Sequence, residues 1–245
     1  MIKAKQAVID VQADNVAVAE RTAKWLIEQM QKAIDKFSIC LSGGNTPKLL
    51  YQTLAQPEYS KQIPWTKVHL FWGDERFVSQ NDDLSNYKMV KTALLDHISI
   101  PEANVHFIDT AMVNAAAAAD AYEKELKNFY GSNVLTPKHF LFDVTLLGLG
   151  GDGHIASLFP NTAVLSEQNA WVKAVIGVKK EDRITLTYPP LQSSAAVAFL
   201  VTGAEKKTII KSVLNGEGDL PASKLKPEGN LYWFLDQTAY MSTSK

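Results

Sequence analysis

Short apolar runs that alternate with helical segments constrain the fold of this chain more than any other feature. Apolar runs occupy residues 37–41, 68–72, 144–147 and 196–201, and segments with helical periodicity, such as residues 16–34, lie between them. Strands that alternate with helices are typical of a mostly parallel sheet with helices on both faces. The sequence therefore predicts the α/β class with an open, Rossmann-like sheet. It does not predict the order of the strands.

Further segments complete the alternation. The expected additional elements are helices over 86–97, 115–129 and 206–214, a helix that begins at Thr46, and strands over 184–186 and 231–235. Asp14 or Asn15 is placed to cap the first helix, and Thr46 to cap the second with Pro47 at its first position. Because no repeat or long linker interrupts the pattern, we expect residues 1–245 to form a single domain.

The composition excludes several classes of partner. The 245 residues are 46% hydrophobic and 21% charged, and their net charge of −1 provides no basic field for nucleic acid or an anionic membrane. Residues 1–6 lack the apolar core of a secretory signal, and no segment has the roughly 18 apolar residues of a spanning helix. The single cysteine, Cys40, lies inside an apolar run. We therefore expect a cytoplasmic protein without a disulfide, and its oligomeric state stays open.

The segment after the third apolar run is the strongest candidate for chemistry. Residues 147–160 read LGLGGDGHIASLFP, in which four glycines allow a sharp turn and close approach to a ligand. Asp152 and His154 emerge from this turn two residues apart. Histidine is suited to general-base chemistry near neutral pH, so His154 is the candidate base. Asp152 is the candidate to set its tautomer or to position water.

A second glycine-containing segment follows the first apolar run and is a candidate anion site. It reads Ser42, Gly43, Gly44, Asn45, Thr46 and joins a strand to a helix, where free N–H groups and the helix dipole favour negative charge. The glycines permit close approach, and the Ser42 and Thr46 hydroxyls add donors. The spacing is too short for a nucleotide-binding P-loop, so a single sugar phosphate fits better.

Three motifs in one order resemble a known family. SGG-x-TP at 42–47, GDER at 73–76 and G-x-G-x-D-G-H-x-A-S-L-F-P at 148–160 follow one another as in the 6-phosphogluconolactonases, a branch related to the glucosamine-6-phosphate deaminases. The resemblance continues through RITLT at 183–187, TGAEK at 202–206 and PAS at 221–223, and so covers most of the chain. Asn45 and Ile155 stand where the family more often carries Ser and Thr.

The resemblance implies a function and a set of site residues. The function is hydrolysis of 6-phospho-D-glucono-1,5-lactone to 6-phosphogluconate in the oxidative pentose phosphate pathway, with His154 activating water and with no cofactor or metal. Arg76 would face the substrate and hold charge on oxygen, with Glu75 orienting it. The remaining substrate contacts implied are Asp74, Gly150 and Gly151, with Arg183 and Lys206 as clamps for the phosphate.

Alternative functions remain open at this point. A hexosamine-phosphate deaminase or isomerase on the same scaffold would carry N-E-P where this chain has Leu158-Phe159-Pro160, and phenylalanine cannot exchange protons. A non-catalytic sugar-phosphate sensor would not need Asp152 and His154. The glycine spacing also matches a dinucleotide fingerprint, but Pro160 would break the helix that this fingerprint requires.

Overall fold

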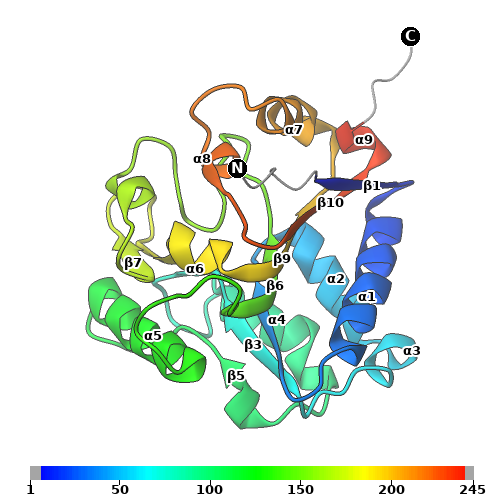
Figure 1. Cartoon of the computed structure of the whole chain (residues 1–245), viewed down its shortest axis with the longest axis horizontal. Coiled ribbons are helices and arrows are strands. Elements are labelled where there is room, and N and C mark those ends of the chain that lie inside the picture. The colour runs from blue at the N-terminus through cyan, green and yellow to red at the C-terminus, as the bar shows by residue number, and fades with distance from the viewer. Residues whose placement is uncertain (1–6, 241–245) are drawn as a thin grey trace.

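The apolar runs form the parallel sheet that the alternation predicts. The computed structural model describes residues 7–240, so the expectation about residues 1–6 lies outside the described part of the chain. Seven strands follow the order β1-β10-β9-β6-β2-β3-β5, and every neighbouring pair is parallel (Figure 1). Their bounds are β1 (Val8–Gln12), β2 (Phe37–Leu41), β3 (Val68–Trp72), β5 (Val105–His106), β6 (Phe142–Leu147), β9 (Ser194–Val201) and β10 (Asn230–Asp236).

Three further strands form a separate antiparallel sheet. They are β4 (Asp74–Arg76), β8 (Arg183–Leu186) and β7 (Val172–Val175), paired in the order β4-β8-β7. The strand expected over residues 184–186 is therefore present as β8, but it lies in this second sheet and not among the parallel strands. The partner strand β4 is short and entirely polar, so no hydrophobic pattern marks it in the sequence.

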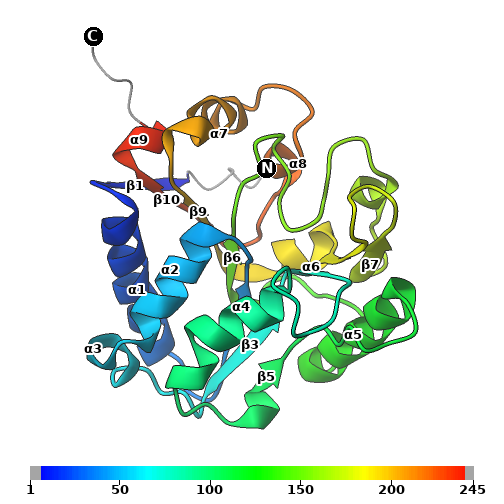
Figure 2. The same cartoon turned by 180° about the vertical axis from the view of Figure 1, so that it is seen from behind.

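Helices flank the parallel sheet. In Figure 2, α1, α2 and α4 lie side by side in front of it, and from the opposite side, in Figure 1, α6 lies in front of the sheet with α5 and β7 nearby. The helices are α1 (Asn15–Gln31), α2 (Asn45–Ala55), α3 (Pro57–Ser60), α4 (Asn86–Ala93), α5 (Ala115–Tyr130), α6 (Tyr188–Gln192), α7 (Lys207–Leu214), α8 (Pro221–Lys224) and α9 (Gln237–Tyr240). None of the helices within residues 7–240 is both long and apolar enough to span a bilayer.

The helix boundaries correct two expectations about length. Helix α1 is capped by Asp14, whose carboxylate accepts from the Ala17 N–H at 2.9 Å, but it ends three residues before the expected limit at 34. The helix expected over 86–97 stops at Ala93, because Leu94 has a φ of −135° and leaves the helical region. A short 3₁₀ turn over Leu95–His97 replaces its last part.

The start of α2 also differs from the expectation. Gly44 is the N-cap residue, at a φ of 105° that favours glycine, and α2 begins at Asn45. Thr46 is therefore already inside the helix and makes no cap hydrogen bond. Its hydroxyl instead lies 2.9 Å from the Thr202 hydroxyl. The start of α2 thus has no side-chain cap, and the Tyr51 hydroxyl holds the turn through the N–H and carbonyl of Ser42.

The sheet has a topological switch point between β2 and β6. From β2 the chain continues through β3 to β5 at one edge, and from β6 it continues through β9 and β10 toward the other edge. In open α/β sheets, ligands bind beyond the carboxyl ends of the strands at such a point. The Ser42 and Gly148 turns leave these two strands, and the Gly148 N–H donates to Ser42 Oγ at 3.2 Å.

Candidate active site

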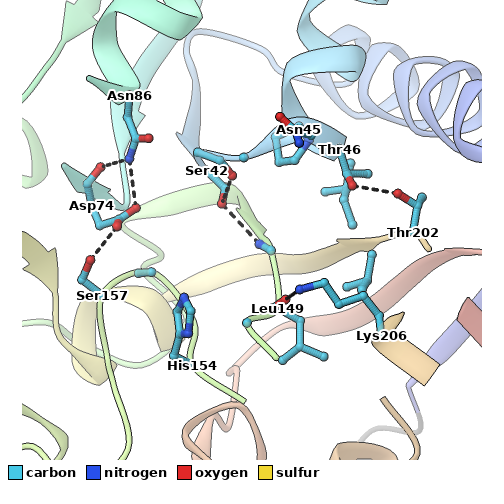
Figure 3. Close-up of a pocket in the computed structure, with 18 of the residues that line it drawn as sticks. Ser42, Asn45, Thr46, Asp74, Asn86, Leu149, His154, Ser157, Thr202 and Lys206 are labelled. Atoms are coloured by element: carbon cyan, nitrogen blue, oxygen red, sulfur yellow. Dashed lines mark hydrogen bonds between the residues drawn. The ribbon is translucent and has the colours of Figure 1, made fainter. Parts of the chain in front are cut away.

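A cavity of about 680 Å³ opens at the carboxyl ends of the central strands. The loops after β2, β3, β6 and β9 contribute to it (Figure 3). Of the residues predicted for the site, these line it: Ser42, Gly43, Gly44, Asn45, Thr46, Asp74, Arg76, Gly150, His154, Arg183 and Lys206. Gly151 and Asp152 do not line it, because both lie on the outer side of the glycine turn and are exposed.

Asp152 nevertheless belongs to the site through His154. Its Oδ1 lies 2.5 Å from Nδ1 of His154. Burial favours a higher pKa for Asp152, but hydrogen bonds from the side chain and backbone N–H of His154 outweigh it and lower the pKa. Because an ionised carboxylate only accepts, we assign the imidazole proton to Nδ1. The basic nitrogen is then Nε2.

The turn that carries His154 requires glycine at position 150. The Gly150 N–H donates to the carbonyl of His154 at 2.9 Å, which closes the turn. A Cβ on Gly150 would lie 2.0 Å from Nδ1 of His154 and would clash with the imidazole ring. Close approach of backbone to the candidate base is therefore possible only without a side chain at this position.

Replacing Gly150 by alanine should displace the imidazole and lower turnover on the substrate proposed below about a hundredfold, since a shift of 1 Å in a reacting group can have that effect. Steady-state kinetics of the folded variant test this. Gly151→Ala is the matched comparison, because an added Cβ there meets no heavy atom of the described residues within 4 Å. Equal losses in the two variants would contradict the steric explanation.

Asp74 is held by two neutral side chains in the cavity wall. The Ser157 hydroxyl donates to Asp74 Oδ2 at 2.7 Å, and the Asn86 amide donates to its carbonyl at 2.9 Å and to Oδ1 at 3.3 Å (Figure 3). Asn86 in turn fills the space beside Gly43, where a Cβ would lie 2.1 Å from the Asn86 Oδ1. This network fixes the Asp74 carboxylate in place.

Glu75 and Arg76 are arranged differently from the expectation. The buried Glu75 carboxylate accepts from the backbone N–H groups of Arg76, Asn86 and Tyr87 at 2.7–2.8 Å, so it caps α4. Burial raises the pKa of Glu75 despite these hydrogen bonds. Glu75 therefore contacts Arg76 through its backbone N–H, while Nη1 of the Arg76 side chain donates to the carbonyl of Leu84.

Arg183 is a half-buried cation that lines the cavity. It lies opposite Arg76 in the β4–β8 pair, and its nearest carboxylate, that of Glu181, is 3.8 Å away. Its Nη1 is buried and has no hydrogen-bond partner among residues 7–240. Burial and the neighbouring Arg76 both lower the pKa of Arg183. Two adjacent guanidinium groups with an unpaired donor favour an anionic ligand.

Lys206 is the second predicted phosphate clamp, and it is anchored at another wall. Its Nζ donates to the carbonyl of Leu149 at 2.8 Å (Figure 3). No hydrogen bond or shared partner among the described residues links it to Arg183. That the two cations meet around one phosphate therefore remains a prediction.

Several lining residues were not predicted. Ser157, Phe159, Thr202 and Glu205 lie inside the recognised motifs, so the sequence carried a signal for them, whereas Asn86 and Lys179 lie in none. Lys179 Nζ stands 4.7 Å from the centroid of the Phe159 ring. Within residues 7–240, no group of three or more His, Cys, Asp or Glu side chains is placed to hold a metal ion.

Comparisons with known proteins identify the family of this chain. Residues 13–233 match the family model described as glucosamine-6-phosphate isomerases/6-phosphogluconolactonase. A 6-phosphogluconolactonase of Synechocystis sp. is 40% identical over 239 residues, covering 94% of this chain and 96% of that protein. A chloroplastic 6-phosphogluconolactonase of Arabidopsis thaliana is 36% identical over 247 residues, covering 97% of this chain and 74% of that protein.

Solved structures extend the similarity to the fold. The 6-phosphogluconolactonase of Thermotoga maritima is 29% identical with a TM-score of 0.81, covering 94% of this chain and all of that one. A monomeric glucosamine-6-phosphate deaminase is 19% identical with a TM-score of 0.79, covering 95% and 98%, and this likeness shows the fold alone. Since the family model and the relatives span nearly the whole sequence, the chain belongs to the glucosamine-6-phosphate isomerase/6-phosphogluconolactonase family.

Proposed function

We propose that this protein hydrolyses 6-phospho-D-glucono-1,5-lactone to 6-phosphogluconate. The observation that carries the proposal is the His154–Asp152 pair, held on a glycine turn beside a cavity that is also lined by Arg76, Arg183 and Lys206. Such a cavity combines a general base with groups that bind an anion, as a phosphorylated lactone requires. The names of the similar proteins support the same substrate.

The reaction follows from the tautomer assigned to His154. Nε2 takes a proton from water, and the resulting hydroxide attacks the lactone carbonyl carbon. Arg76 and nearby backbone N–H groups stabilise the negative charge that develops on the carbonyl oxygen. When the bond to the ring oxygen breaks, the imidazolium returns its proton to that oxygen. Asp152 holds the imidazole orientation and stabilises its protonated form, and no covalent intermediate, metal or cofactor takes part.

The phosphate of the substrate is assigned to the cationic side chains of the cavity and to the start of α2. Gly43 and Gly44 expose backbone N–H groups there, and the helix dipole adds positive potential. Arg183 and Lys206 supply the full charges. Asp74, fixed by Ser157 and Asn86, positions the sugar rather than transferring a proton.

We further propose that the whole chain acts as one catalytic domain. The buried apolar residues of both sheets belong to a single cluster, which includes Ile39 of β2, Phe199 of β9 and Ile184 of β8. Arg76 and Arg183 lie on the three-stranded antiparallel sheet, and His154 follows a strand of the parallel sheet. The cavity therefore needs both sheets in place.

Decay of the phosphorylated lactone with and without the protein tests the proposed function, since the lactone also hydrolyses spontaneously. We expect rapid acid production with the protein and no ammonia from glucosamine 6-phosphate. Phe159 stands where the deaminase branch has a proton-exchanging glutamate, and its ring packs 4.8 Å from the His154 ring. Ammonia release at a rate comparable to lactone hydrolysis would favour the deaminase function instead. Tight lactone binding without turnover would favour a sensor.

A further inference from the structure

The ammonium group of Lys206 connects the predicted phosphate-binding part of the cavity with the turn that carries the candidate base, His154. Lys206 ends the 3₁₀ turn Ala204–Lys206 after β9, and Leu149 lies in the turn after β6. Because β6 and β9 are neighbouring parallel strands, both turns leave the same edge of the sheet. The hydrogen bond from Lys206 Nζ to the Leu149 carbonyl therefore joins the predicted phosphate clamp to the turn of the candidate base (Figure 3).

The Leu149 carbonyl lies in the same peptide unit as the N–H group that closes that turn. This carbonyl and the Gly150 N–H belong to the same peptide unit, which is planar and stiff. The Gly150 N–H donates to the carbonyl of His154 at 2.9 Å, and the Gly150 Cα packs against the imidazole. A group that fixes the Leu149 carbonyl therefore also fixes the direction of the N–H that holds His154.

The two ends of the turn have different supports. At the far end, the Ala222 N–H of α8 donates to the Gly153 carbonyl at 3.0 Å. At the near end, Ser42 Oγ accepts from Gly148, and Lys206 binds Leu149. Within residues 7–240, Lys206 is the one charged side chain from outside the turn that hydrogen-bonds its backbone. The near end is therefore the end whose support carries a charge.

An ammonium group has three donors, of which Leu149 uses one. We propose that Lys206 is a positioning residue that holds the Leu149 carbonyl and the substrate's phosphate at the same time. Phosphate binding then restrains the His154 turn in its closed geometry. The inference rests on the proposed function for the identity of the phosphate ligand, whereas the contact between Lys206 and the turn is independent of it.

Hydrogen exchange of the amides in residues 148–154 tests the connection without an activity assay. We compare the wild-type protein, Lys206→Met and Lys207→Met, each with and without inorganic phosphate. Lys207 begins α7 beside Lys206 but does not line the cavity, so it is the matched control. Losing a hydrogen bond from a charged group should raise exchange in the turn about tenfold or more.

The expected pattern has two parts. Phosphate slows exchange of the turn in the wild type and in Lys207→Met, while Lys206→Met exchanges faster and does not respond to phosphate. Wild-type exchange in Lys206→Met, or no phosphate effect in the wild-type protein, would overturn the proposal. Should Lys206→Met fail to fold by circular dichroism, Lys206→Gln, which keeps a polar end without the charge, takes its place.

Steady-state kinetics on the phosphorylated lactone show whether Lys206 positions the His154 turn or only binds the phosphate. A residue that only binds phosphate would raise KM when removed, whereas the positioning role predicts that Lys206→Met also lowers kcat. Lys206→Arg, which keeps charge and donors, should recover part of that kcat. A loss confined to KM would contradict the positioning role. A wild-type protein that hydrolyses no lactone would refute the proposed function, while the exchange measurement would still decide the inference.

Discussion

Replacing His154 by asparagine should lower turnover of the phosphorylated lactone about a hundredfold or more, the usual size of a general-base contribution. Asparagine is close in size and polar but cannot accept a proton from water. The KM should change little, because His154 acts on water rather than on the phosphate. Steady-state kinetics, corrected for the spontaneous hydrolysis of the lactone, measure both values.

Two further variants make this test specific. Asp152→Asn should also reduce turnover, because an amide can donate to Nδ1 of His154 and move the imidazole proton to Nε2, where the base must be free. His97→Asn is the control, since His97 lies on the 3₁₀ turn after α4, where Nε2 is 3.0 Å from the carbonyl of Thr92 and outside the cavity. Near wild-type turnover in folded His154→Asn would refute the general-base mechanism.

The second large effect concerns the phosphate of the substrate. Unphosphorylated gluconolactone should be hydrolysed with a kcat/KM at least about a hundredfold lower than the phosphorylated lactone. A hydrogen bond to a charged group contributes about 1.5–3 kcal/mol, so losing two contacts costs at least about 3 kcal/mol of transition-state binding. The guanidinium group of Arg183, which lines the cavity, is one of the groups that would lose its ligand.

Variants in the antiparallel sheet test whether Arg183 contributes to binding of the substrate's phosphate. Arg183→Ala should sharply reduce kcat/KM for the phosphorylated lactone, and inorganic phosphate should compete with this substrate in the wild type. Lys180→Ala is the control, because the Lys180 side chain is 93% exposed on the same hairpin and lies outside the cavity. Similar kcat/KM values for the two lactones in the wild type would contradict both the proposed phosphate site and the proposed substrate.

The sequence by itself determined the class of the fold and predicted the centre of the candidate site. Alternating apolar and helical segments predict a parallel sheet, and three chemistry-bearing motifs each follow a strand, so their convergence at one edge follows from topology. The His154–Asp152 pair is local, since only two residues separate them, and a glycine turn is enough to bring them together. These features depend on short-range patterns, which a sequence displays directly.

The tertiary structure decided the features that depend on contacts between distant segments. The pairing of Arg76 with Arg183 arises from a polar strand and an antiparallel sheet without any periodic signal. Asn86 occupies the space beside Gly43, and Lys206 reaches the turn of His154, because packing brought together loops that no local propensity links. Side-chain partners of this kind are selected by the final geometry, so the motifs predict which loops line the cavity but not which side chains meet there.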